Sequence, residues 1–297
     1  MMLDFKPITL SDKALYEKYL HLSTHRGCNF SFANVYLWGK QSILEKDGCL
    51  MTLSQFGKFF VYPYPLGKGD IKIAVSALID DAAERKIPLR LSGLLDAECE
   101  ELDAAFPDVF CFKPSRDSSD YVYLIEDLAE LKGKKYHGKR NHLNRFYAAH
   151  PKFTVEPLSE NNVSAVREMT NEWFKSREVP EGESFELEKS ALEKAFRDYK
   201  ELELETLVLK NEGEVIAYTM ASRMFEDTFD VHFEKARMDV EGAYTAINCE
   251  FAKYIREKYP EIRYLNREED MGLEGLRKAK LSYHPHHFIE KRTAVMK

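Results

Sequence analysis

The sequence lacks several features that would narrow its class at once. It has no CxxC or CxxH spacing and no apolar run near the roughly 20 residues that cross a bilayer. The N-terminus has no basic start followed by an apolar core, so it does not resemble a secretory signal. The odd cysteine count indicates reduced thiols, and we expect a cytoplasmic protein with no membrane-spanning segment. The dispersed cysteines are Cys28, Cys49, Cys99, Cys111 and Cys249.

Signatures of common enzyme classes are also missing. No GxSxG, HExxH or P-loop pattern occurs. Three histidines lie close together at His284, His286 and His287, but no cysteine or carboxylate stands beside them at ligand spacing. The sequence therefore predicts no metal site. The net charge of −7 argues against non-specific coating of nucleic acid and leaves room for one local anion site.

The 297 residues suffice for two domains. From residue 153 onward, periodicity and turn signals predict the order β-α-α-β-β-β-α-β-α-β. This is the layout of the GNAT acyltransferase fold, with a mixed sheet, a helix after the fourth strand and a splayed sheet where substrate sits. The first half repeats the plan less clearly, with a hairpin over 48–67 and a closing hairpin over 108–128.

We therefore expect an α+β protein of two tandem GNAT-like (acyl-CoA N-acyltransferase) domains, with mixed, mostly antiparallel sheets flanked by helices. The N-terminal domain is expected over residues 1–130. The C-terminal domain is expected over 131–297, preceded by a basic helix at 131–150.

The expected basic helix stands out by charge. The stretch "KGKKYHGKRNHLNRFYAAHPK" (132–152) has seven Lys or Arg residues and no acid, so the rest of the chain carries −14 against its +7. Lys135 and Lys139 share a helix side, and Arg140 and Asn144 are four residues apart, close enough to grip one oxyanion. This favours a clamp for a phosphate or carboxylate in a cleft between the domains.

Two other interpretations of the basic helix stay open. It could be a solvated face paired with the acidic surface around it. Alternatively, its aromatic and basic residues could contact RNA phosphates and stacked bases, although no RNA-binding motif supports this.

A second dense segment, "NREEDMGLEGLRKAKLSYHP" (266–285), links a strand end to a helix through an acidic step. One of the three acids of this step, Glu268, Glu269 and Asp270, could accept a proton from an attacking amine or hold its ammonium group. Tyr283 could protonate a leaving group. The alternative is a helix N-terminus that carries acids because the helix dipole favours them. The expected substrate-binding residues here are Asn266, Asp270, Arg277 and Lys280.

The middle strand "DVHFEKA" carries His232 and Glu234, which alternate onto one face if the strand is regular. Glu234 is a candidate general base, directly or through water. A His and a Glu two residues apart are equally common as partners on a half-exposed strand.

The turn before the long helix argues against a coenzyme A donor. Enzymes that use acetyl-CoA carry a run like Q/R-x-x-G-x-G/A there, which binds the pyrophosphate. Here "RMDVEGAYTAIN" supplies Arg237 and Gly242, but the spacing is wrong. The first half offers only Gly67 and Gly69, which also fall short of the pattern. Acetyl-CoA or another acyl-CoA is therefore the less favoured cofactor, and none is assigned.

Taken with "SFANVYLW" near the start, the segments "LKGKKYHGKRNHLNRF" and "LNREEDMGLEGLRKAKLSYHP" resemble the phosphatidylglycerol lysyltransferase C-terminal-domain-like family. The resemblance spans nearly the whole chain. It implies a tandem GNAT fold and kinship with Fem-type peptidoglycan bridge enzymes, which take an aminoacyl group from aminoacyl-tRNA. The lysyltransferases transfer that group to a lipid headgroup.

The resemblance also implies roles for the two segments. The basic segment would meet the tRNA acceptor end or a substrate phosphate. Glu269 or Asp270 would hold an ammonium, while Arg277 and Lys280 would stabilise developing negative charge. The residues that the resemblance assigns to tRNA or phosphate are Lys135, Lys139, Arg140, Asn144 and Arg145.

We therefore expect an acyl- or aminoacyltransferase that acts on an amine or hydroxyl acceptor, with aminoacyl-tRNA as the donor. The lipid-modifying enzymes of the family carry a large membrane portion that this sequence lacks, so the acceptor stays open. The alternatives are a CoA-dependent N-acetyltransferase, or a binding protein that keeps the fold without the reaction.

Overall fold

The computed structural model describes residues 2–176 and 183–297, which form two compact units. The first unit comprises Met1–Ser119, Glu183–Ala191 and Ile289–Lys297, and the second comprises Asp120–Gly182 and Leu192–Phe288. The boundary between the two GNAT-like domains at residue 130 stays a prediction, because the compact units need not coincide with repeated domains.

The sheet of the first unit has the strand order β1-β2-β3-β4-β6-β13, with β5 paired to β3. One pair in it, β4–β6, is parallel, and the helix α3 provides the crossover that a parallel pair requires. The elements up to residue 105 are β1 (Lys6–Pro7), α1 (Lys13–Leu22), α2 (Phe32–Leu37), β2 (Lys40–Lys46), β3 (Cys49–Phe56), β4 (Phe59–Pro63), β5 (Leu66–Gly67), α3 (Ile71–Arg85), β6 (Arg90–Leu94) and α4 (Asp96–Ala105).

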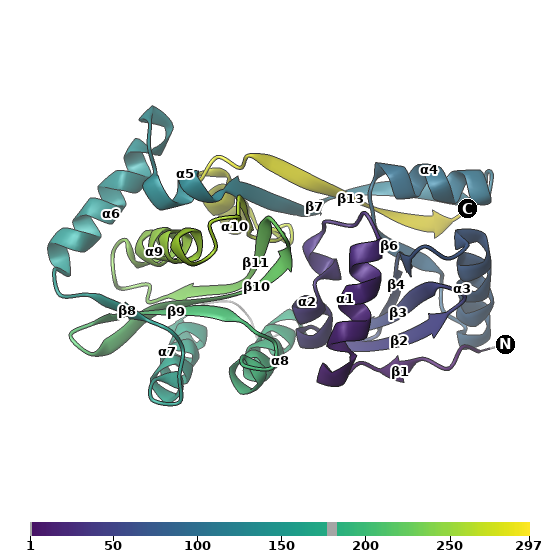
Figure 1. Cartoon of the computed structure of the whole chain (residues 1–297), viewed down its shortest axis with the longest axis horizontal. Helices are drawn as coiled ribbons and strands as arrows, with labels where there is room; N and C mark the ends of the chain where they lie inside the picture. Colours follow the sequence, from purple (N-terminus) through teal and green to yellow (C-terminus); the bar gives the residue numbers. More distant parts are fainter. Residues whose placement is uncertain (1, 177–182) are drawn as a thin grey trace. The chain divides into compact units, whose positions relative to one another are not determined.

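The sheet of the second unit has the order β7-β12-β11-β10-β9-β8, and its parallel pair is β11–β12. Helix α9 contacts one face of β10 and β11, and α7 contacts the opposite face (Figure 1). The elements from residue 110 are β7 (Phe110–Leu124), α5 (Ile125–Glu130), α6 (His137–Ala149), β8 (Thr154–Glu156), α7 (Val163–Ser176), α8 (Glu183–Asp198), β9 (Glu205–Asn211), β10 (Glu214–Phe225), β11 (Thr228–Ala236), α9 (Ala243–Lys258), β12 (Tyr264–Asn266), α10 (Glu274–Leu281) and β13 (His287–Met296).

This order confirms the element sequence predicted from residue 153 onward, and α6 with the short helical turn Lys134–Tyr136 confirms the basic helix. One prediction in the first half is wrong, because 108–128 is no hairpin but the long strand β7 followed by α5. Strand β2 precedes the predicted hairpin over 48–67 and pairs with β3. The polar run "SRDSSD" resembles a turn, yet it continues as extended backbone and becomes buried from Ser119 onward.

Helix α9 is the central helix of the second unit because its apolar residues recur at helical spacing. Ala246, Ile247, Phe251 and Ile255 are buried in the core that covers the sheet. The helix begins after Gly242, whose φ of +82° is readily adopted only by glycine. No helix of the described residues is long and apolar enough to cross a membrane.

The loop from β12 to α10 is held by an ion pair between the buried Asp270 carboxylate and the half-buried Arg277 guanidinium. Asp270 Oδ2 accepts from Arg277 Nε at 2.8 Å and from the Tyr121 hydroxyl at 2.5 Å, and its Oδ1 accepts from the Gly272 N–H at 2.9 Å. The hydrogen bond from Arg277 contributes most to holding the pKa of the Asp270 carboxyl well below its usual range. The carboxylate is therefore ionised at neutral pH and fixes the start of α10.

The contact between α6 and α9 gives a first prediction. A Cβ on Gly242 would lie 2.7 Å from the His142 carbonyl oxygen and 3.0 Å from the Phe146 Cβ, and its φ is positive. Gly242→Ala should therefore lower the free energy of unfolding by about 1–3 kcal/mol. Gly138→Ala, in open space on the same α6, should raise it by about 0.5–1 kcal/mol. Denaturant unfolding measures both, and equal effects of the two substitutions would contradict the packing.

The Asp270–Arg277 pair gives a second prediction. Asp270→Asn removes the charged acceptor of the Arg277 guanidinium, so the free energy of unfolding at pH 7 should fall by about 1–3 kcal/mol. Because the folded pKa is depressed, the stabilisation is present above the unfolded value of about 3.9 and is lost as pH falls below it. The stability difference between wild type and variant should shrink accordingly.

The matched control is Glu274→Gln, which removes the exposed pair between Glu274 and Lys278 on the same helix. We expect less than about 0.5 kcal/mol from it. A loss from Asp270→Asn that stayed constant down to pH 2 would contradict the ionised pair.

Candidate functional site

The parallel pair β11–β12 ends within the second unit at a point rich in charged residues. Thr228, Phe229 and Asp230 of β11 pair with residues 264–266 of β12, and the pairing stops there. The next residues of the β12 side, Arg267 and Glu268, reach back to β11 by side-chain contacts. The carboxyl ends of parallel strands are where α/β proteins commonly bind ligands. We therefore take this point as the candidate site.

A β-bulge in β11 decides which side chains meet there. The register pairs Met220 with Phe233 and Ala221 with Val231, so His232 is an extra residue on β11. His232 contacts Ser222 and Glu268, whereas Glu234 contacts Asn248 of α9. The regular alternation that would place His232 and Glu234 together on one face is therefore interrupted, and the two residues belong to separate clusters.

The Glu234 cluster consists of Glu234, Arg267, Asn248, Lys139 and Tyr283. Glu234 Oε1 accepts from Arg267 Nη2 at 2.8 Å, and Oε2 accepts from Asn248 Nδ2 at 3.1 Å. The Tyr283 ring lies 3.8 Å from Lys139 Nζ and 4.8 Å from Arg267 Cζ, so both cations face one aromatic ring. Three predicted site residues, Glu234, Tyr283 and Lys139, are thus brought together around an arginine.

Two polar atoms of the cluster have unused hydrogen-bonding capacity. Arg267 Nη1 and Asn248 Oδ1 are buried and have no hydrogen-bond partner among residues 2–176 and 183–297. Asn248 as a whole is only 4% exposed, so bulk water does not solvate its side chain freely. One atom is a donor and the other an acceptor, and each belongs to a group already bonded to Glu234. A ligand that offers both an acceptor and a donor would satisfy them.

Burial shifts the pKa values of Lys139 and Tyr283. Burial, followed by the nearby Arg267 charge, lowers the pKa of Lys139 to about 8, although Glu234 opposes the shift. Burial also raises the pKa of Tyr283 to about 12. At neutral pH Lys139 is therefore mostly an ammonium near its titration point, and Tyr283 keeps its proton.

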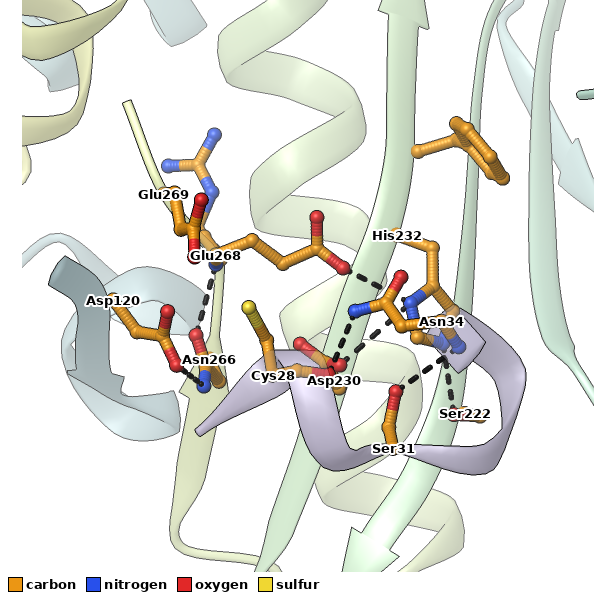
Figure 2. A network of polar contacts seen from close by, with 12 residues as sticks. Cys28, Ser31, Asn34, Asp120, Ser222, Asp230, His232, Asn266, Glu268 and Glu269 are labelled. Carbon is orange, nitrogen blue, oxygen red and sulfur yellow. Dashed lines mark hydrogen bonds and ion pairs between the residues drawn. The ribbon is translucent and has the colours of Figure 1, made fainter. Parts of the chain in front are cut away.

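The His232 cluster consists of Ser222, Asp230, His232 and Glu268. His232 Nε2 lies 2.8 Å from Ser222 Oγ, and Nδ1 lies 3.0 Å from Glu268 Oε1 and 3.7 Å from Asp230 Oδ2 (Figure 2). Asp230, His232 and Glu268 each offer a ligand atom within 4.8 Å of the others, so these three could hold a divalent cation.

The other predicted residues of the 266–285 segment build the loop itself. Asn266 Nδ2 donates to Asp120 Oδ2 at 3.0 Å, and its Oδ1 accepts from the Glu268 N–H at 2.8 Å. The Lys280 ammonium donates to the backbone carbonyls of Arg267 and Glu269. Asp270 and Arg277 form the ion pair described above. Substrate contacts by Asn266, Asp270, Arg277 and Lys280, and catalysis by Glu269, stay predictions.

Most of the basic residues of α6 and the preceding turn have partners outside the Glu234 cluster. Lys135 pairs with Asp127 at 3.1 Å, and Arg145 pairs with Glu241 at 2.5 Å. Arg140 Nη1 donates to the carbonyls of Leu131 and Gly133, and Asn144 is exposed. The structure therefore brings only Lys139 of this set to the cluster. Anion binding by Lys135, Arg140, Asn144 and Arg145 stays a prediction.

The pairing of Arg145 also concerns the start of α9. Glu241 directly precedes Gly242, and its carboxylate pairs with Arg145 at 2.5 Å. The His142 carbonyl oxygen packs close to Gly242. The residue that precedes Gly242 thus carries a carboxylate paired with a cation of α6.

Arg267 and Asn248 were not predicted as site residues, and Glu268 was predicted only as one of three acids at a strand end. Arg267 lies inside the 266–285 segment, directly after a strand, so its position was an available signal. Asn248 lies among apolar residues of α9, so a single amide on the buried face of that helix was the only signal in the sequence. No feature of the local sequence predicts the bulge that separates His232 from Glu234.

Comparison with known proteins places the chain in a family. Residues 20–295 match the family model described as phosphatidylglycerol lysyltransferase, C-terminal, and no curated protein matches the chain. A crystal structure of a conserved protein of unknown function from Bacteroides thetaiotaomicron VPI-5482 shares 37% identity, with a TM-score of 0.90 and full coverage of both chains.

Two more distant structures share the fold. L-PGS from Bacillus licheniformis is 15% identical, with a TM-score of 0.67 over 96% of this chain and 91% of that chain. A tandem GNAT protein from the clavulanic acid biosynthesis pathway is 12% identical, with a TM-score of 0.51 over 98% of both chains. The predicted tandem GNAT-like fold is thereby confirmed, and the chain belongs to the phosphatidylglycerol lysyltransferase C-terminal family.

Proposed function

We propose that this protein transfers an aminoacyl group from an activated ester, with aminoacyl-tRNA as the donor, to an amine or hydroxyl acceptor. Membership of the family supports an acyl- or aminoacyltransferase-like function. The choice of an aminoacyl group, and the assignment of the reaction to the Glu234 cluster, are the steps that we add.

The observation that carries the proposal is the pair of unused polar atoms beside Glu234. The carbonyl oxygen of an aminoacyl ester would accept from Arg267 Nη1, and its ammonium group would donate to Asn248 Oδ1. A plain acyl group has the carbonyl without the ammonium, so it would leave Asn248 Oδ1 unsatisfied. Leaving such a buried group unpaired costs about 1–3 kcal/mol, which favours the aminoacyl substrate.

The chemistry follows from the charges in the cluster. When the acceptor attacks the ester carbonyl, the oxygen becomes negative, and Arg267 and Lys139 would stabilise that charge. Glu234 keeps unused lone pairs on both oxygens, so it would accept the proton of the attacking group. Tyr283, still protonated at neutral pH, would donate a proton to the leaving oxygen.

The basic residues outside the cluster have a place in this scheme. Lys135, Asn144 and Arg145 are exposed, so phosphates of a tRNA acceptor end could compete with the acidic partners of the two cations. Exposed ion pairs contribute little to stability, so exchanging them for phosphate contacts costs little. An anionic acceptor, such as a phospholipid headgroup, would meet the same side chains.

The alternative of a CoA-dependent N-acetyltransferase meets an obstacle at α9. The turn before α9 lacks the glycine pattern, and its Glu241 already pairs with Arg145, a cation that a diphosphate would otherwise contact. A binding protein without a reaction is the other alternative. It would bind the aminoacyl ester without transferring the group.

The substrate choice gives a third prediction. An aminoacyl ester should react about 5- to 150-fold faster, as kcat/KM, than the matching ester without its amino group, because only the former satisfies Asn248. Asn248→Leu should reduce this preference to near unity. Transfer to a hydroxylamine acceptor measures both rates.

The control is Glu257→Gln, an exposed residue of α9, which should leave the preference unchanged. Equal rates for the two esters in the wild type would contradict aminoacyl recognition. Efficient transfer from acetyl-CoA would favour the acetyltransferase instead.

The Lys139 ammonium gives a fourth prediction. Because an ammonium loses its charge above its pKa, kcat/KM should fall as pH rises through about 8. Lys139→Arg keeps the charge at higher pH, so it should move this decline upward by more than one pH unit. A pH–rate profile of both proteins decides the matter, and an unchanged decline in the variant would assign it to another group.

A further inference from the structure

Lys139 has an unusual environment for a half-buried lysine. Its neighbour Lys135 pairs with Asp127 at 3.1 Å, whereas Lys139 Nζ makes no hydrogen bond or ion pair among residues 2–176 and 183–297. The contact of Lys139 Nζ is the Tyr283 ring, whose centroid lies 3.8 Å away. An ammonium group carries three donors, and a ring face replaces only part of the water that burial removes. The charged form of Lys139 is therefore weakly stabilised.

A second cation lies close to Lys139. The Arg267 guanidinium faces the same Tyr283 ring, with Cζ 4.8 Å from the centroid. Glu234, the carboxylate of the cluster, is bonded to Arg267 and Asn248. A lysine that is removed from water beside another cation is activated as a nucleophile, because its neutral amine form is favoured. Accordingly, burial and then the Arg267 charge lower the pKa of Lys139 to about 8, against the opposing effect of Glu234.

A small reagent can reach Lys139 along α6. Gly138 is exposed and faces open space, since a Cβ built on it would meet no atom within 4 Å. Within the cluster, Arg267 Nη1 is a buried donor with no hydrogen-bond partner in the described part of the chain. A carbonyl oxygen that accepts from Arg267 Nη1 would be polarised, which makes its carbon more electrophilic. The cluster thus combines an accessible amine with a donor for an acyl oxygen.

We propose that Lys139 is a modification site that small activated acyl donors (esters, thioesters and acyl phosphates) convert to an amide, and that this conversion inactivates the transfer site. The neutral Lys139 Nζ attacks the carbonyl carbon, and the bond from that carbon to the leaving oxygen or sulfur breaks. The nitrogen loses one proton to Glu234 or to water, and an alkoxide or thiolate leaving group takes up that proton. A phosphate leaves as an anion, and the proton then remains in water.

The inactivation rests on the proposed function, whereas the modification itself does not. An amide nitrogen takes up no proton near neutral pH, so acylation removes one of the two cations of the Glu234 cluster. Arg267 alone would then face the negative charge that develops on the ester oxygen during transfer. Acylation of Lys139 should therefore slow aminoacyl transfer.

The test is acetylation of the full chain with a limiting amount of acetyl phosphate, followed by peptide mass spectrometry that locates each acetyl group. Lys134, exposed on the turn before α6, is the internal reference. At pH 7.5 Lys139 should be acetylated about 10-fold faster than Lys134, because a larger share of it is neutral amine. Above about pH 10 most of both amines is neutral, so the ratio of the two rates should fall to about 1 or below.

Arg267→Gln removes the neighbouring cation and the donor to the acyl oxygen, so it should slow acetylation of Lys139 about 5-fold or more. The matched control is Arg223→Gln, because Arg223 is exposed on β10 and pairs with Glu261 at 2.9 Å. It should leave the rate unchanged. Equal rates in wild type and a folded Arg267→Gln variant would overturn the proposal. If that variant does not fold, the wild type still decides, because a Lys139 to Lys134 ratio of 1 or less at pH 7.5 overturns it.

Transfer to hydroxylamine measures the consequence for activity. The rate should fall in proportion to the share of chains acetylated at Lys139. Lys139→Arg, which has no amine to acetylate there, should keep the rate that it had before treatment. An undiminished rate in chains fully acetylated at Lys139 would overturn the inactivation. Rapid acetylation of Lys139 in a wild-type protein that transfers no aminoacyl group would support the modification site and contradict the proposed function.

Discussion

The pairing of Arg267 with Glu234 is the interaction on which the candidate site of the second unit depends. It joins the residue after β12 to β11 beyond the point where their backbone pairing has ended. Burial disfavours a guanidinium, so the charge persists there because Glu234 and the faces of Tyr123 and Tyr283 compensate for lost water. A charge held in this way interacts strongly with any group placed beside it.

Lys139 adds a second cation to the same small volume. Two cations and one carboxylate leave the cluster with a net positive charge while Lys139 keeps its proton. In a partly buried environment such an excess favours an anion, or a reaction in which negative charge develops on an oxygen. The basic helix thus matters to the proposed chemistry chiefly through the one lysine that turns inward.

The loop between β12 and α10 supports both clusters. Lys280 donates to the carbonyls of Arg267 and Glu269, which are the residues on either side of Glu268. Asp270, Arg277 and Tyr121 then fix the next turn. The acidic and basic density that marks this segment in the sequence therefore serves local architecture as well as the proposed chemistry.

The sequence predicted the second half of the fold well because amphipathic helices and turn residues there act locally. It failed at β7, where a polar run remains extended. It predicted Glu234, Tyr283 and Lys139 as site residues, which the structure brings into one cluster, and each is a charged or phenolic residue in an expected place. It could not identify Arg267 with Asn248 as their partners, because those contacts join residues far apart in the chain. The bulge at His232 depends on pairing with β10, which a single strand does not reveal.

Adjacent residues of opposite charge contribute to the two clusters: Arg267 belongs to the Glu234 cluster and Glu268 to the His232 cluster. Glu268 adopts a left-handed φ of +58°. Deleting one residue before Arg267 would move the Glu268 carboxylate toward Glu234 and would move the Arg267 guanidinium away from Glu234. The segment that follows β12 should therefore tolerate substitutions of side chains more readily than insertions or deletions, which we expect elsewhere on the chain.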